Sequence, residues 1–228
     1  MDVMRLLGRE GLAPATRATY SGALRAFFRW CTTMELREDD PMDKAPRVRV
    51  PKGGPRPITT EQMGRLLAVL NRRRTRAMVY LMVFAGLRVH EVAKLRAEDC
   101  DLQAGTLTVT GKGGKTAILP MHPELVRLAH DMPQTGPWFP TYAGGRSHIA
   151  PGSVTKVVGA AMERAGFHAT AHQLRHWYGS ELVARGVDLR TVQTLLRHEN
   201  LGTTEIYTAV PDGARRAGVD RLELPAAA

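Results

Sequence analysis

Apolar residues recur at intervals of three and four along several segments of the chain, which is the pattern of amphipathic helices. The first such segment covers residues 14–36, and its apolar positions are Leu24, Phe27, Phe28 and Cys31. Three basic residues fall largely on the other side: Arg17, Arg25 and Arg29. That side is either an ordinary solvated face or a face turned towards phosphate groups, and the pattern alone leaves both interpretations open.

Residues 39–57 show no periodicity and contain five prolines, two glycines and five basic residues, a composition typical of a linker. Its cations, which include Lys52 and Arg56, can lie along a nucleic-acid backbone. Thr59 then precedes Gln62 by three positions, as in the capping box that starts a helix. The apolar run AMVYLMVFAGL predicts a buried helix ending at Gly86.

Further helices are predicted over residues 123–131, 152–165, 172–185 and 189–196. Between them, GTLTVTG and TAILPM alternate apolar and polar residues on either side of GKGGK, which predicts a β-hairpin with a glycine-rich turn. The expected fold class is therefore α+β, mainly helical with one small antiparallel sheet.

The amino-acid composition of the chain indicates a class of binding partner. The chain has 228 residues, of which 43% are hydrophobic and 24% charged, as in an ordinary globular protein. Its 32 Lys and Arg against 22 Asp and Glu give a net charge of +10, which favours a polyanionic partner such as nucleic acid. Two cysteines without metal-ligand spacing, no long apolar span and no secretory signal in MDVMRLLGRE favour an intracellular protein.

The hairpin turn ends in GGKT, residues 113–116, which looks like the end of a phosphate-binding loop. A Walker A loop needs a glycine where this chain has Val109, so that interpretation fails. Lys112 and Lys115 remain at the hairpin tip. Turn lysines are usually just solvated, although a hairpin tip can bring an ammonium group to a phosphate.

The segment HQLRHWYGSEL places His172 and Arg175 on one helix face. His172 and His176 have the i, i+4 spacing of a metal pair, but no HExxH glutamate or evident third ligand accompanies them. Joint binding of an anionic group is the better interpretation, and a local hydrogen bond at the helix start is the plain alternative.

Two other segments carry candidate chemistry. Arg88 follows the predicted buried helix and needs either Glu91 or a substrate phosphate as its partner. In HENLGTTEIY, His198 precedes Tyr207 by nine residues, and a threonine can cap a short helix that carries the tyrosine. Taken alone, Tyr207 is more simply a packed aromatic residue.

Together these arginines, histidines, lysine and tyrosine suit phosphoryl transfer without a metal. Cations neutralise the non-bridging oxygens, a nucleophile attacks in line, and an acid protonates the leaving oxygen. A tyrosine hydroxyl, whose unperturbed pKa is about 10, needs nearby cations or a base to act as a nucleophile at neutral pH.

The chain resembles the tyrosine recombinases, the phage-integrase family, from about Leu12 to about Val210. The resemblance is carried by GLRVHEV, TGKGGKTAILP, HQLRHWYGSEL and LLRHENLGTTEIY, in this order. It implies that Arg88 and Arg175 clamp the scissile phosphate and that His198 donates a hydrogen bond to it. It further implies that His172 assists proton transfer at the tyrosine.

In the same family pattern, Lys112 is the general acid for the departing 5′ oxygen, and Tyr207 forms a 3′-phosphotyrosine. Glu91 supports the site from behind Arg88, and the family needs neither a metal nor another cofactor. Arg197 and His90 depart from the pattern: a glycine commonly precedes the histidine of LLRHENLGTTEIY, and a small residue usually stands at position 90. Arg197 is either a further phosphate contact or a change in the turn.

The amino end is short for this family, since only about fifty residues precede the catalytic domain. The expected domains are a reduced helical core-binding segment and linker (1–50), the catalytic domain (51–210) and a tail (211–228) that can dock on a neighbouring protomer. GLAPATRATYSGALRAFFRW resembles the last long helix of a core-binding domain. The chain is accordingly either a minimal recombinase or a truncated form, and we expect the apolar face of this helix to be covered.

The predicted function is site-specific integration or excision of a phage or other mobile element. The expected partners are a double-stranded attachment site, three further copies on DNA with a monomer in solution, and an accessory directionality factor. The expected location is the bacterial cytoplasm, at the nucleoid. A type IB topoisomerase-like nicking and resealing enzyme and a non-catalytic DNA-binding regulator are the alternatives. The DNA-binding candidates are Arg17, Arg25, Arg29, Lys52, Arg56, Lys115 and Arg197.

Overall fold

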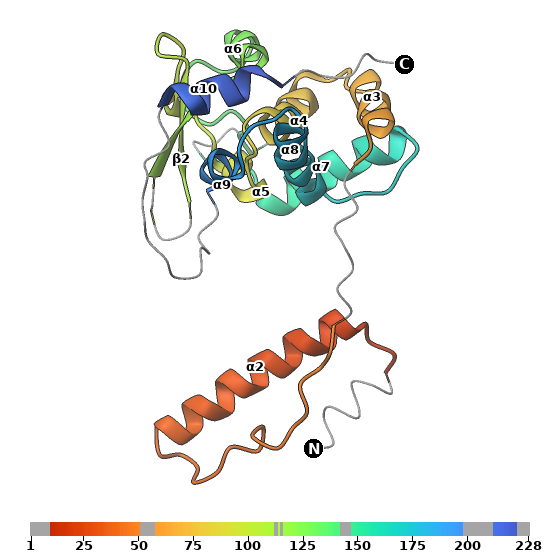
Figure 1. Ribbon diagram of the computed structural model, residues 1–228, viewed down its shortest axis with the longest axis vertical. Coiled ribbons are helices and arrows are strands. Elements are labelled where there is room, and N and C mark those ends of the chain that lie inside the picture. Colours follow the sequence, from red (N-terminus) through yellow and green to blue (C-terminus); the bar gives the residue numbers. More distant parts are fainter. Residues whose placement is uncertain are drawn as a thin grey trace. The chain divides into compact units, whose positions relative to one another are not determined.

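The computed structural model describes residues 10–50, 58–111, 114, 116–141, 147–197 and 212–222. The chain divides into two compact units, Met1–Gly54 and Pro55–Ala228 (Figure 1). The first contains one long described helix. The second contains the small sheet and the remaining described helices.

Helix α2 (Pro14–Thr33) forms the first unit, with proline in its first turn and its carboxyl end at Met34. It ends three residues before the predicted boundary, and Glu35 adopts a left-handed φ of 57° just beyond it. The Arg25 guanidinium donates to the carbonyls of Met42, at 2.6 Å, and of Ala45. These bonds fold the following segment back against the helix. Arg25 therefore stabilises this unit from within.

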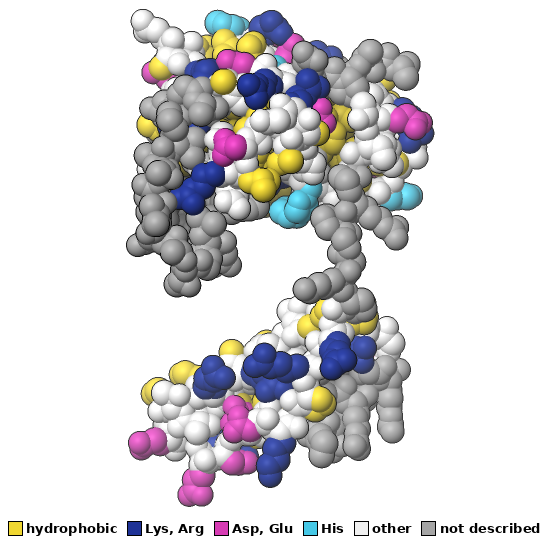
Figure 2. All heavy atoms as spheres, in the orientation of Figure 1, with side chains coloured by type: hydrophobic (Ala, Val, Ile, Leu, Met, Phe, Trp, Pro, Cys, Tyr) yellow, Lys and Arg dark blue, Asp and Glu magenta, His cyan; other side chains and the backbone are white. Residues whose placement is uncertain are grey.

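The rest of α2 presents both cations and apolar groups. Figure 2 shows Lys and Arg side chains gathered along the visible face of the first unit. Large apolar side chains are also exposed on this helix and at its C-cap, each by about half: Tyr20, Phe27, Trp30 and Met34. The covering that we expected for this apolar face remains a prediction.

The second unit is mainly helical, and its described α-helices follow the predicted segments closely, except that α5 was not predicted. They are α3 (Thr60–Ala68), α4 (Arg73–Phe84), α5 (Val89–Lys94), α6 (Pro123–His130), α7 (Pro151–Arg164), α8 (Ala171–Ala184), α9 (Leu189–Leu196) and α10 (Asp212–Asp220). The predicted capping box starts α3: the Thr59 side chain accepts from the Gln62 backbone at 3.1 Å, and the Gln62 side chain accepts from the Thr59 backbone at 3.0 Å.

Helix α4 lies at the centre of this unit, in contact with α6, α7 and α8 (Figure 1). From Ala77 onwards its sequence is apolar on nearly all sides, which is the pattern of a helix surrounded by others. Met78, Leu81, Met82 and Phe84 are accordingly fully buried. The end of α4 is therefore held in place from several directions, and the candidate site begins there.

The sheet has the order β1–β2–β3 and is antiparallel throughout. Strands β2 (Thr106–Thr110) and β3 (Thr116–Pro120) form the predicted hairpin, with Leu107 opposite Leu119. Strand β1 (Cys100–Asp101) follows a 3₁₀ helix, η1 (Ala97–Asp99). This strand was not predicted, because two residues are too few to show an alternation of apolar and polar positions. The α+β fold class is confirmed.

Helix α10 packs against α9 and β3 of its own unit. The Arg216 guanidinium donates to the carbonyls of Met121, at 2.7 Å, and Gly105, at 2.6 Å. His122 Nε2 lies 2.7 Å from the Leu222 carbonyl, and the Leu222 side chain is buried. A helix in the predicted tail is therefore present, and in this chain it docks on the same unit.

Candidate active site

The site starts at the turn between α4 and α5. Gly86 adopts a left-handed φ of 58° there, a conformation that glycine reaches without a steric penalty. Arg88 follows as the N-cap of α5, and its backbone N–H donates to Glu91 Oε2 at 2.6 Å. Arg88 Nη1 also donates to Glu91 Oε1 at 3.2 Å. The predicted partnership of Arg88 and Glu91 is therefore present.

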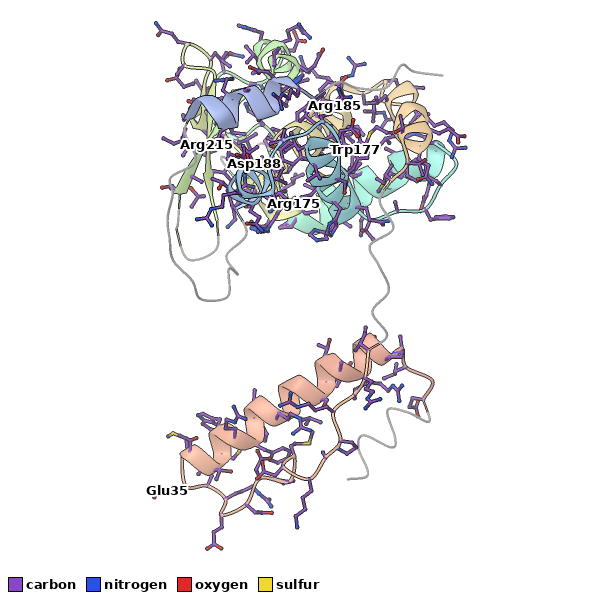
Figure 3. All side chains as sticks on the ribbon, in the orientation of Figure 1. Glu35, Arg175, Trp177, Arg185, Asp188 and Arg215 are labelled. Carbon is purple, nitrogen blue, oxygen red and sulfur yellow. The ribbon has the colours of Figure 1, made fainter. Side chains whose placement is uncertain are left out.

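Arg175 on α8 approaches the same turn. Its Nη1 donates to the Gly86 carbonyl and its Nη2 to the Leu196 carbonyl. Figure 3 labels this side chain on α8, beside the region of α9 that carries Asp188 at its start. Arg175 is only 3% exposed, and burial, followed by the charges of Arg88 and Arg197, lowers its pKa. Arg175 therefore joins the α4–α5 turn to the end of α9.

Arg197 closes the arrangement from the carboxyl end of α9. Its Nη2 donates to Glu91 Oε2 at 2.8 Å, and its backbone carbonyl accepts a bond of 3.3 Å from Arg88 Nη2. Two guanidinium groups, those of Arg88 and Arg197, thus bind one buried carboxylate, and Arg175 adds a third positive charge nearby, which leaves a surplus of positive charge. A surplus of this kind can bind an anion such as phosphate.

His172 and His176 stand one turn apart on α8, with their rings edge-to-face at a centroid distance of 4.5 Å. They line a cavity of about 430 Å³, together with Arg175 and Gln193. Burial lowers the pKa of His172, and the charges of His176, Arg175 and Arg88 lower it further. A neutral His172 imidazole can accept a proton at neutral pH.

A second groove, of about 760 Å³, lies between α5 and the β2–β3 hairpin. His90 and Lys94 of α5 line it, together with Glu91 and with Thr110 and Gly111 of the hairpin. The groove therefore runs from Glu91 to the end of β2, at Thr110 and Gly111.

Of the predicted catalytic residues, Arg88, His172 and Arg175 come together, with Glu91 beneath Arg88. Six other candidates lie outside the described residues: Lys112, His198, Tyr207, Lys52, Arg56 and Lys115. Among the DNA-binding candidates of the first unit, Arg29 is exposed and Arg17 is partly buried.

Tyr178 also shapes the site, although the sequence pattern did not single it out. It is 1% exposed, and burial raises the pKa of its hydroxyl, so it stays neutral. A Cβ added at Gly86 would lie 2.7 Å from the Tyr178 ring, so the ring fixes the turn that precedes Arg88. Its place three residues after Arg175 in HQLRHWYGSEL was the available signal.

Within the described ranges, no three His, Cys, Asp or Glu side chains gather as metal ligands. The same ranges contain no helix of the length and apolar character that a bilayer crossing requires.

A family model described as "Phage integrase family" matches residues 56–213. Tyrosine recombinase XerA of Pyrococcus furiosus is 32% identical over 213 residues, which are 89% of this chain and 72% of that protein. Tyrosine recombinase XerD of Caulobacter vibrioides is also 32% identical, over 227 residues and 90% and 73% of the two chains.

Solved structures show the same relationship. The integrase from mycobacterium phage Brujita superposes with a TM-score of 0.70 at 47% identity, covering 93% of this chain and 73% of that one. A lambda integrase dimer bound to a COC′ core site shares the fold, with a TM-score of 0.67 at 18% identity and coverage of 89% and 80%. The chain therefore belongs to the phage integrase family and is a tyrosine-type site-specific recombinase.

Proposed function

We propose that this enzyme cleaves and rejoins DNA strands at a specific site with Tyr207 as its nucleophile. One observation carries the assignment of the site: Arg88 and Arg175, far apart in sequence, both bind the Leu196–Arg197 end of α9. His198 is the next residue, and Tyr207 follows nine positions later. The arginine pair therefore stands at the entrance to the segment that carries the nucleophile.

The chemistry follows from these groups. The Tyr207 oxygen attacks the scissile phosphorus, the phosphorus–O5′ bond breaks, and a 3′-phosphotyrosine forms. Arg88 and Arg175 neutralise the non-bridging oxygens, the more exposed Arg88 by contact and the buried Arg175 through its charge, and His198 donates a hydrogen bond to one of these oxygens. His172 accepts the tyrosine proton, and Lys112 protonates the departing 5′ oxygen. A 5′ hydroxyl then attacks the phosphotyrosine and releases Tyr207, which restores the strand.

The partner is a double-stranded attachment site, bound by four copies of a chain that is monomeric in solution. Solved relatives include a lambda integrase tetramer bound to a Holliday junction and XerH bound to a difH substrate, which supports this assembly. The likeness to a phage integrase supports integration and excision of a phage or mobile element. An accessory directionality factor and action at the bacterial nucleoid, in the cytoplasm, complete the proposal.

We assign residues 1–50 to a reduced core-binding segment and linker, 51–210 to catalysis and 211–228 to the tail. Exposed cations of α2, such as Arg29, contact the DNA backbone in this scheme. A tail that docks on a neighbouring protomer must first give up the contacts that α10 makes with α9 and β3.

A nicked duplex that traps covalent adducts tests the proposal. We expect wild-type enzyme to become linked to a candidate attachment site, and Tyr207→Phe to form no adduct. Tyr20→Phe is the matched control, because Tyr20 is an exposed tyrosine of α2, and it should react like wild type.

Failure of wild type to form adducts on candidate attachment sites, or adducts in Tyr207→Phe, would contradict the proposal. Relaxation of supercoiled plasmids without such a site would favour the topoisomerase-like alternative. Specific DNA binding without any adduct would favour a regulator.

A further inference from the structure

The carboxyl end of α9 is bound to the Arg88–Glu91 pair through both the backbone and the side chain of one residue. We infer that Arg197 is a positioning residue: its guanidinium holds the Glu91 carboxylate, and its carbonyl holds the Arg88 guanidinium. Arg88 thereby keeps a fixed orientation relative to the carboxyl end of α9. This inference deepens the proposed function and rests on it for its catalytic consequence.

The burial of Glu91 makes its partners important. Its side chain is fully buried, and a buried carboxylate is costly unless hydrogen bonds and opposite charge compensate it. Oε1 accepts only from Arg88 Nη1 in the described structure, whereas Oε2 accepts from the Arg88 backbone and from Arg197 Nη2. Removal of the Arg197 guanidinium would leave Arg88 as the single cationic partner, drawn more strongly towards Glu91.

The backbone of Arg197 supports the same role. Its φ of 53° and ψ of 47° are left-handed, a conformation that is unfavourable for a residue with a Cβ. This conformation directs the Arg197 carbonyl to Arg88 Nη2, at 3.3 Å. Contacts made by the Arg197 side chain compensate the unfavourable backbone.

The alternative role, a contact to a DNA phosphate, fits the geometry less well. Arg197 is 12% exposed, and its terminal nitrogens point inwards. Nη2 donates to Glu91 and to the Gly86 carbonyl, at 3.3 Å, and Nη1 donates to the Leu195 carbonyl, at 3.2 Å. Its Nε is buried and has no hydrogen-bond partner within the described residues. A guanidinium used in this way presents little to an outside phosphate.

The test compares Arg197→Gly, Arg197→Lys, Glu91→Gln and the double variant Arg197→Gly/Glu91→Gln. Glycine accepts the left-handed backbone, so Arg197→Gly removes the side chain without adding strain. The matched control is Arg185→Gly, because Arg185 is the C-cap of α8, has a negative φ and pairs with Glu181 at 2.9 Å. Each variant is measured for DNA affinity, for its salt dependence and for the single-turnover adduct rate at saturating nicked duplex.

We expect Arg197→Gly to lower the adduct rate about 10- to 100-fold, since small misplacements of a catalytic group have effects of this size. DNA affinity and its salt slope should stay close to wild type. Arg197→Lys should recover part of the rate, because lysine keeps the charge but not the planar set of donors. The double variant should be no slower than the slower single variant, and Arg185→Gly should match wild type.

Three results would overturn the inference. They are a wild-type rate in Arg197→Gly, a loss of affinity and salt slope with an unchanged rate at saturation, and multiplicative rate losses in the double variant. If Arg197→Gly does not fold, Arg197→Lys and Glu91→Gln give the same comparison.

A measurement on the free protein separates this inference from the proposed function. In wild type without DNA, the Arg88 side-chain N–H signals in NMR should exchange slowly with water. They should shift and exchange faster in Arg197→Gly, but not in Arg185→Gly. Unchanged Arg88 signals would overturn the inference even if wild type forms no adduct, and that failure by itself would contradict only the proposed function.

Discussion

The two arginines of the site differ in how they are placed. The Arg175 side chain is buried, and its two terminal nitrogens donate hydrogen bonds to the carbonyls of Gly86 and Leu196. The Arg88 side chain is 32% exposed, so part of its guanidinium faces outwards. Arg175 therefore supports the local fold in addition to its charge, whereas Arg88 is the more accessible cation for a phosphate.

This difference predicts separable effects of Arg88→Ala and Arg175→Ala. Both should abolish adduct formation on the nicked duplex with little loss of DNA binding. Arg175→Ala should also lower the free energy of unfolding by about 2–4 kcal/mol, because two buried carbonyls lose their donor. Chemical denaturation measures this, and a wild-type stability of Arg175→Ala would contradict the assignment.

The lowered pKa of His172 predicts the pH dependence of the adduct rate. A histidine whose pKa lies below its ordinary value of 6.5 stays neutral, and able to accept a proton, as the pH falls to that value. The rate should therefore hold between about pH 8 and 6.5 and fall only at lower pH, as the imidazole becomes charged.

Single-turnover rates measured across this range check the prediction. His172→Gln should remove the acid limb, and His168→Gln, a change at an exposed histidine, should keep it. A rate that already falls from pH 8 to 7 in wild type would contradict a lowered pKa at His172.

At the scale of elements, the α4–α5 turn determines where Arg88 lies. The turn is tight because Gly86 has a positive φ and because the Tyr178 ring packs against it. The sequence indicated a helix end at Gly86, since an apolar run stops there. It could not indicate the ring of α8 that covers the glycine, because that contact joins distant segments.

The close approach of the Tyr178 ring to Gly86 predicts that Gly86→Ala is strongly destabilising. An added Cβ would lie 2.7 Å from the Tyr178 ring at a φ of 58°, so the expected loss is about 3 kcal/mol or more from crowding and strain together. Gly159→Ala is the control: nothing lies within 4 Å of its added Cβ, and alanine should gain about 0.5–1 kcal/mol inside a helix. Thermal unfolding of both variants measures the difference, and similar melting temperatures would show that the turn is not tight.

At the scale of the whole molecule, the chain has 32 basic and 22 acidic residues, and its net charge of +10 favours binding to DNA. Several cations are used inside the fold, including Arg25, Arg175 and Arg216. The number of phosphate contacts is therefore smaller than the number of cations. Their sum still gives the chain a long-range attraction for a polyanion.

DNA affinity should fall linearly with salt on logarithmic axes, because each neutralised phosphate releases counterions. We expect Arg29→Ala to reduce this slope by about one unit, as loss of one phosphate contact does. Arg25→Ala should instead leave the slope unchanged and lower stability. Binding isotherms at several salt concentrations measure the slopes, and a flat response in wild type would contradict the electrostatic argument.

The sequence by itself determined most of the helices, the hairpin and the residue types of the site, but not α5. Periodicity and capping depend on neighbours three or four positions apart, so GTLTVTG, TAILPM and Thr59 carry their own signals. The order of the four motifs was enough to indicate the family that the comparisons then showed.

Only the tertiary structure decided how the cations are used. Arg25 and Arg197 looked like candidate phosphate contacts, yet Arg25 donates to the carbonyls of Met42 and Ala45, and Arg197 donates to the Glu91 carboxylate. Helix α10 likewise docks on its own unit, through contacts with residues far back in the chain. The physical reason is that a charged side chain or a helix binds the groups that folding brings within reach. The spacing of residues along the chain does not give the distance between segments that are far apart in sequence.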